Sequence, residues 1–183
     1  MPNSSETLAR TGGRPVQRIV YTADEIAARV QEMGQEIADF YPPGESILML
    51  GLLKGSFIFM ADLVRAIPRP AQIDFLIASS YGAGTVSSGD VKLLYDTEVA
   101  MEDRHVLLVE DIIDSGTTLK RLMPMLESRG PRSIELVTLL HKRIATLVRE
   151  PRWVGFDCPR EFLVGYGLDH SEDFRNLPFI ASL

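Results

Sequence analysis

The sequence predicts one α/β domain with a central, mostly parallel sheet flanked by helices. Short apolar runs of strand length alternate along the chain with segments that have helical spacing, and residues 106–140 read as strand, helix and strand. A strand, crossover helix and strand in succession normally make two parallel strands. The 183 residues, 45% of them hydrophobic, suffice for one core, and no internal repeat or low-complexity linker indicates a second domain.

The first residues differ in character from the rest. Residues 1–17 are polar and include Gly12, Gly13 and Pro15, which predicts a mobile tail before a domain that spans residues 18–183. Thr22 and Glu25 then form the pattern of a capping box, so a helix should begin there, and residues 41–44 should end it. The following elements are predicted as strand, helix and strand, over residues 46–52, 57–66 and 73–79.

A glycine- and serine-rich segment follows the third of these elements. Residues 81–89 are too polar to pack by themselves, which makes them a candidate lid. The segments Val91–Tyr95 and Glu98–Val99 are predicted as hairpin arms that carry this lid.

The most informative stretch is Val106–Thr118. Val106–Val109 has the apolar composition of a buried strand, and Asp114–Thr118 combines a glycine with three hydroxyl side chains. A helix is predicted over Leu119–Arg129, so this turn would present phosphate-binding N–H groups at a helix N-terminus. Glu110 and Asp111 would repel a phosphate, which indicates that they serve ribose hydroxyls or a magnesium ion. A turn that only capped the helix, through Asp114 or Ser115, would require neither Glu110 nor Asp111.

This pattern resembles the phosphoribosyl-pyrophosphate (PRPP) signature of the type I phosphoribosyltransferases, and its Glu-Asp-Ile-Ile-Asp-Ser-Gly form is most similar to the hypoxanthine-guanine branch. The resemblance extends over residues 20–183 and implies a small hood and a flexible lid hairpin in addition to the sheet. It also implies transfer of the phosphoribosyl group of PRPP to hypoxanthine and to guanine, giving IMP or GMP and pyrophosphate, with Mg²⁺ as cofactor.

The resemblance assigns roles to residues of this chain. Asp114 would handle the purine N7 proton, and the 5′-phosphate would be bound by Asp114, Ser115, Gly116, Thr117 and Thr118. Ribose would meet Glu110 and Asp111, pyrophosphate would meet Lys54, Gly55 and Arg175, and the lid would begin at Ser80 and Tyr81. The purine side would contain Lys142, Phe162, Leu163 and Asp169, and the metal ligands would be Glu110, Asp111 and Asp169.

The fold rule supports part of this assignment independently. Lys54, Glu110 and Lys142 each follow a predicted strand, and the carboxyl ends of parallel strands meet at one edge of a sheet. We therefore expect these three side chains to converge, although nothing in their separate local patterns requires it.

Composition limits the partners and the compartment. A net charge of −6 argues against a nucleic-acid surface, and no apolar run is long enough to span a membrane. The single cysteine excludes an intrachain disulfide and favours the reducing cytoplasm. The resemblance implies a homo-oligomer, a dimer or a tetramer. Two alternatives stay open: a PRPP-responsive RNA-binding regulator of the same fold, and a xanthine-preferring phosphoribosyltransferase.

Overall fold

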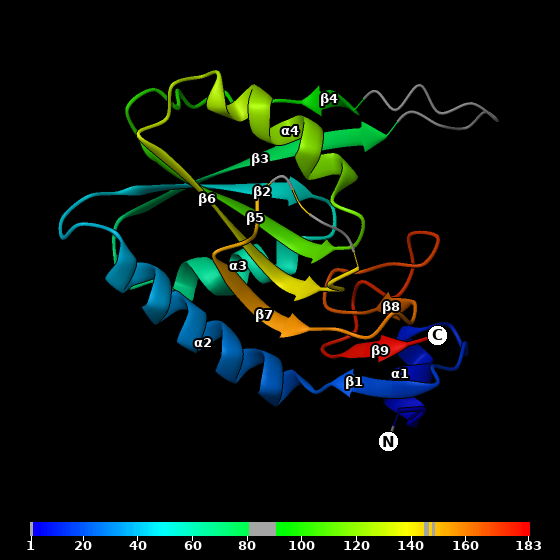
Figure 1. Cartoon of the computed structure of the whole chain (residues 1–183). Helices are drawn as coiled ribbons and strands as arrows, with labels where there is room; N and C mark the ends of the chain where they lie inside the picture. Colours follow the sequence, from blue (N-terminus) through cyan, green and yellow to red (C-terminus); the bar gives the residue numbers. More distant parts are fainter. Residues whose placement is uncertain (1, 81–90, 145–146, 148) are drawn as a thin grey trace.

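The computed structural model describes residues 2–80, 91–144, 147 and 149–183, and it contains two sheets (Figure 1). The large sheet has the strand order β4-β3-β2-β5-β6-β7 and is parallel except for β4 at its edge. The small sheet, β1-β9-β8, is antiparallel and forms the hood. The predicted α/β fold with a mostly parallel sheet is confirmed. The strands are β1 Arg18–Tyr21, β2 Ile47–Leu53, β3 Ala71–Ser80, β4 Val91–Tyr95, β5 His105–Ile113, β6 Ser133–His141, β7 Trp153–Asp157, β8 Leu163–Val164 and β9 Ile180–Ser182.

Helices cover both faces of the large sheet, as Figure 1 shows. They are α2 Ala23–Phe40 and α3 Phe57–Ala66 on one face and α4 Thr117–Glu127 on the other, whereas α1 Ser5–Arg10 lies beside the small sheet. Along β5, Leu107 and Val109 pack toward α2 and α3, whereas Val106 and Leu108 pack toward α4. This two-sided burial explains why the central strands are continuous apolar runs. The Thr22–Glu25 capping box that starts α2 is present, as predicted.

Two predicted boundaries are wrong. Strand β5 does not end at Val109 but continues to Ile113, because its pairing with β6 extends past the two acids to Ile112↔Leu140. Glu98–Val99 is not a strand but irregular backbone with a bend at Val99, where Asp74 accepts hydrogen bonds from the Thr97 hydroxyl and from the Glu98 N–H.

The N-terminal segment also differs from its prediction as a mobile tail. It contains helix α1, and the Asn3 side chain both donates to the Val16 carbonyl oxygen at 3.0 Å and accepts from the Val16 N–H at 2.9 Å. Val16 is 2% exposed and packs in a small cluster with Val164, Phe174 and Leu177. Polar composition suggested a tail because the apolar partners of Val16 lie more than 140 positions away in the sequence.

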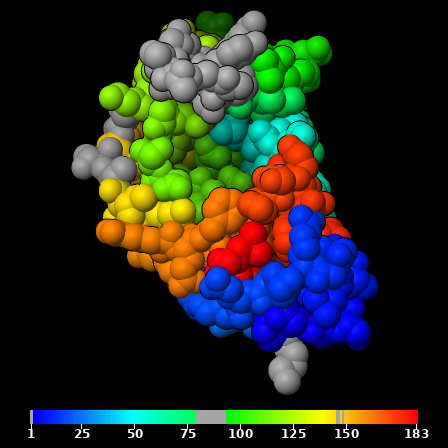
Figure 2. Space-filling model, turned by 90° about the vertical axis from the view of Figure 1, so that its right-hand side faces the viewer, coloured from blue at the N-terminus to red at the C-terminus, as the bar shows by residue number. Residues whose placement is uncertain are grey.

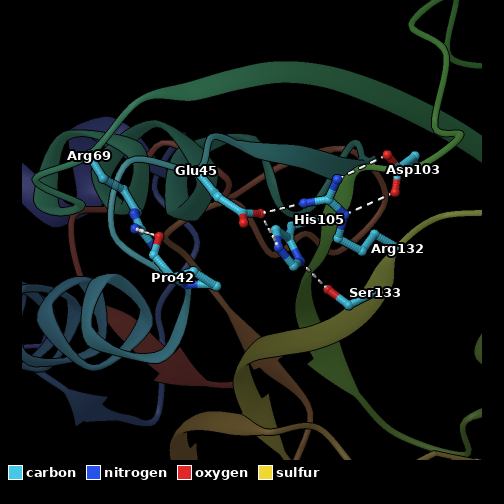
Figure 3. A network of polar contacts seen from close by, with 7 residues as sticks. All are labelled: Pro42, Glu45, Arg69, Asp103, His105, Arg132 and Ser133. Carbon is cyan, nitrogen blue, oxygen red and sulfur yellow. Dashed lines mark hydrogen bonds and ion pairs between the residues drawn. The ribbon is translucent and has the colours of Figure 1, made fainter.

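A polar network fixes the amino edge of the large sheet, at the end opposite the predicted site (Figure 3). The His105 ring lies between Glu45, at 2.6 Å from Nε2, and the Ser133 hydroxyl, at 2.6 Å from Nδ1. Arg132 also contacts Glu45, at 2.8 Å, and pairs through two nitrogens with Asp103. The segments that enter β2, β5 and β6 are thereby tied together.

Across the described ranges, no helix combines the length and the apolarity that crossing a bilayer requires.

Candidate active site

A cavity of about 310 Å³ lies at the carboxyl ends of β2 and β5, on the face that Figure 2 turns toward the viewer. Three predicted motifs meet in it: the turn before α4, the acidic pair of β5, and the Lys54-Gly55 turn, together with Asp169 and Arg175 from the chain after β8. Its lining residues are Leu52–Gly55, Glu110–Leu119, Asp169 and Arg175. Of the three side chains predicted to converge, Lys54 and Glu110 line the cavity, whereas Lys142 reaches it only through its contact with Asp114.

The turn before α4 has the form of an anion site. Gly116 adopts a left-handed conformation with φ of 69°, and a Cβ on it would lie 2.3 Å from the Leu147 side chain, so glycine suits both its backbone and its surroundings. The hydroxyls of Ser115 and Thr117 lie 2.9 Å apart, and α4 begins without a side-chain cap. An uncapped helix N-terminus with hydroxyl groups beside it is suited to a phosphate.

In the acidic pair, Glu110 is buried at the floor of this site and Asp111 is half-buried beside it. Burial raises the pKa of Glu110 well above 4.5, and the neighbouring Asp111 adds to the effect. Burial likewise raises the pKa of Asp111 to about 6, although the Ile112 N–H, at 2.8 Å, and the charge of Arg175 favour its ionised form. Both carboxylates would gain from a positively charged or hydroxyl-rich ligand, which restores the interactions that burial removed.

Gly55 allows the acidic pair and the Lys54-Gly55 turn to touch. A Cβ on Gly55 would lie 1.6 Å from the Asp111 Oδ2, and a Cβ on Gly167 would lie 2.2 Å from the Gly55 carbonyl oxygen. The peptide bond between Leu53 and Lys54 is cis. The segments around Gly55, Asp111 and Gly167 can thus approach each other closely because the two glycines have no side chain.

The two predicted pyrophosphate cations, Lys54 and Arg175, are held by acidic side chains of the segment that follows β8. Arg175 contacts Asp169 at 2.8 Å and Glu172 at 3.2 Å, and it donates to the Gly167 carbonyl oxygen at 2.8 Å. Lys54 contacts Glu172 at 3.1 Å. The sequence interpretation missed Glu172, and only its position between Asp169 and Arg175 could have drawn attention to it.

The predicted purine residues are only partly brought together. The Lys142 Nζ contacts the Asp114 Oδ2 at 3.0 Å, with a side chain that is 13% exposed, so it joins the proposed proton acceptor to the purine side. Phe162 is 53% exposed outside the cavity, and its ring is nearly perpendicular to that of His170, at 5.4 Å between centroids. Leu163 is buried in β8. Ser80 ends β3, and the predicted lid at Tyr81–Gly89 lies outside the described residues.

The carboxylates fit a magnesium ion that binds together with a substrate. Within residues 2–80, 91–144, 147 and 149–183, no three histidine, cysteine or acidic side chains are grouped closely enough to hold a metal alone. Glu110, Asp111 and Asp169 all line the cavity and offer oxygen ligands. Magnesium commonly takes one or two protein carboxylates and completes its shell with phosphate oxygens and water.

Comparison with known proteins identifies this arrangement. The phosphoribosyl transferase domain model matches residues 17–171. The chain belongs to this family. Hypoxanthine-guanine phosphoribosyltransferases from Dictyostelium discoideum and Mycobacterium tuberculosis are 42% and 44% identical to it, over 91% and 92% of this chain and 95% and 86% of theirs. A solved hypoxanthine phosphoribosyltransferase from Staphylococcus aureus superposes with a TM-score of 0.86 at 40% identity, covering 92% of this chain and 91% of its own. The resemblance inferred from the sequence is confirmed, and the protein is a glycosyltransferase.

Proposed function

We propose that this phosphoribosyltransferase converts PRPP and hypoxanthine to IMP and pyrophosphate, and uses guanine as a second substrate. The observation that carries the proposal is the contact between Lys142 and Asp114, which joins a purine-reading cation to the phosphate turn. The identity to hypoxanthine-guanine enzymes over most of the chain supports it.

In the proposed reaction, a purine nitrogen forms a bond to C1′ of PRPP as the bond from C1′ to pyrophosphate breaks, and pyrophosphate leaves with the electron pair. Asp114 accepts the N7 proton of the purine. Glu110 and Asp111 hold the ribose hydroxyls and place negative charge beside the sugar cation. Lys54 and Arg175 would turn from Glu172 toward the leaving pyrophosphate, because a polyanion competes well for both cations.

Magnesium would be held by Glu110, Asp111 and Asp169 together with oxygens of PRPP. When bound, it neutralises charge on the pyrophosphate.

The choice of purine would rest on Lys142. A purine with an oxygen at C6 accepts a hydrogen bond from the ammonium group, whereas the adenine amino group presents a second donor. A buried donor without an acceptor costs about 1–3 kcal/mol, more when it is charged, so adenine should be a very poor substrate.

Spectrophotometric turnover of PRPP and magnesium with hypoxanthine, guanine, xanthine and adenine tests this function. We expect nucleotide formation from hypoxanthine and guanine. A preference for xanthine would favour the xanthine-preferring alternative, and equal turnover of adenine would refute the role of Lys142. Tight RNA binding without turnover of any purine would instead favour a regulator, which the net charge of −6 argues against.

We also propose a cytoplasmic homo-oligomer, a dimer or a tetramer. Large apolar side chains at the surface support association, among them Phe57, Ile73 and Tyr95, which are 43%, 51% and 43% exposed. Light scattering after size exclusion would give the mass of the assembly, and a monomer would contradict the proposal.

A further inference from the structure

The N-terminal segment contacts the loop that carries two of the cavity residues. Residues 3–16 precede the part of the chain that the family model matches, and residues 172–176 follow it. Figure 2 shows the N-terminal residues, in blue, against the orange-red and red segments near the end of the chain. These two segments meet on both sides of Arg175 in the sequence.

Arg14 makes the contacts on the first side. Its Nη2 lies 2.6 Å from the Asp173 Oδ2, and its guanidinium carbon lies 4.6 Å from the centroid of the Phe174 ring. Its own position is set by Thr11, which is 2% exposed, accepts from the Arg14 Nε through its carbonyl oxygen at 3.2 Å, and donates to the Arg14 carbonyl oxygen at 2.6 Å. The contacts with Thr11 thus hold Arg14 in the position from which it contacts Asp173 and Phe174.

Arg10 and Asn176 make the contacts on the second side. The Arg10 Nη1 donates to the Asn176 carbonyl oxygen at 3.3 Å, and the Asn176 side chain donates to the Arg10 carbonyl oxygen at 3.3 Å. Arg175 lies between the two anchored positions.

The loop needs such support because its backbone is unfavourable. Ser171, Glu172 and Phe174 have φ values of 54°, 69° and 73°, in the left-handed region that residues other than glycine disfavour. Two backbone hydrogen bonds between His170 and Asp173 close the turn inside it. Conformations of this kind persist only where surrounding contacts hold them.

We infer that Arg14 is a positioning residue for the transfer reaction, holding the turn at Asp173–Phe174 so that Arg175 faces the pyrophosphate of PRPP. The inference rests on the proposed function, since it assumes that Arg175 binds pyrophosphate. Arg14 itself does not line the cavity, and it acts through the loop.

The test is Arg14→Met, which keeps an apolar side chain over Phe174 and removes the charge. Arg14 and Asp173 have side chains that are 46% and 56% exposed, so their ion pair contributes little to global stability and Tm should hardly change. We expect the KM for PRPP, and the KM for pyrophosphate in the reverse reaction, to rise about three- to tenfold, while the KM for hypoxanthine stays close to that of the unchanged enzyme. Hydrogen exchange should accelerate at the amides of residues 170–177 and not elsewhere.

Arg152→Met is the matched control. Arg152 is also paired with an acid, Glu135, at 3.0 Å, and also lies over an aromatic ring, that of Phe40 at 4.3 Å, but it precedes β7 of the large sheet and does not line the cavity. The Arg152→Met substitution should leave the KM for PRPP and the KM for pyrophosphate unchanged. Asp173→Asn should reproduce the effect of Arg14→Met, the double variant should be no worse than either, and Arg14→Lys should restore most of the affinity for PRPP.

Unchanged KM values in Arg14→Met would overturn the inference, as would an equal rise in the KM for hypoxanthine or the same effects in Arg152→Met. Failure of the unchanged protein to use PRPP with any purine would instead overturn the proposed function, so the two failures are distinguishable.

Discussion

Asp114 lines the cavity with an exposed side chain, and it holds a cation, Lys142, at 3.0 Å. We predict that Asp114→Asn lowers kcat about 100-fold or more, because the amide keeps the shape of the side chain but cannot accept a proton. Affinity for IMP, measured by calorimetry, should be largely retained. A full kcat with a raised KM for PRPP would make Asp114 a binding residue only.

Cys158, the only cysteine of the chain, should be unreactive at neutral pH. Burial raises the pKa of its thiol to about 11, more than the nearby charge of Lys142 lowers it. Because the raised pKa favours the neutral thiol, this group stabilises the fold below its unfolded pKa, near 9, and that contribution is lost as the pH rises toward 11. Alkylation by iodoacetamide, followed by mass spectrometry, should be slow at pH 8 and accelerate up to about pH 11. The urea-unfolded chain is the control, and equal rates in both states would contradict the burial.

Which site residues can be read from the sequence depends on how local their signals are. Asp114–Thr118 lies on one turn, so its composition alone indicates an anion site. Glu172 has only a weak local signal, its place three residues before Arg175, and its contact with Lys54 joins positions 118 residues apart. The position of Phe162 likewise depends on how the hood packs, and its prediction as a purine platform stays untested.

The crossing of α2 and α3 brings two helices together at a glycine. A Cβ on Gly34 would lie 2.5 Å from the Ala66 carbonyl oxygen and 2.7 Å from its Cβ. Helix propensity alone predicts that Gly34→Ala stabilises by up to about 1 kcal/mol. We predict the opposite sign, a loss of about 1–3 kcal/mol in the free energy of unfolding, because the helices must separate. Urea unfolding would measure it, with Ala28→Gly on the exposed face of α2 as the control for propensity. A raised midpoint for Gly34→Ala would show that the crossing is looser.

The amino-edge network in Figure 3 should contribute stability without contributing to activity. His105, whose side chain is 12% exposed, has partners on both ring nitrogens. We predict that His105→Ala lowers the free energy of unfolding by about 1–2 kcal/mol and leaves kcat and KM unchanged, since the cavity lies at the other end of the strands. The exposed His170 offers a control substitution with little effect on stability. A change in KM for PRPP would mean that the two edges are coupled.

Helices and strands were predictable from the sequence where the residues that begin and end them lie within or next to the element. The capping box of α2 and the stop after α4 are local signals, and both helices are present. The end of β5 was not predictable, because parallel pairing with β6 carries two charged residues into the strand against their propensity. Helix α1 was missed because it is short and depends on distant partners.

The hood joins the two ends of the chain, since β9 pairs with β1 on one side and with β8 on the other. We predict that removal of residues 179–183 leaves the large sheet folded but abolishes IMP binding, because β1 and β8 lose their common neighbour next to Phe162 and Leu163. Far-UV circular dichroism would report the remaining sheet and calorimetry the loss of binding. Unchanged affinity for IMP would show that the hood has no part in the nucleotide site.

The same pairing sets an order of events during synthesis. Strand β1 ends at Tyr21, but its partner β9 begins at Ile180, so about 160 further residues must be synthesised before the two strands can pair. At about 5–20 residues per second, that delay is roughly 8–30 s. The strands around the phosphate turn emerge and pair well before then. A ribosome-bound chain would therefore carry the phosphate turn before β9 closes the hood.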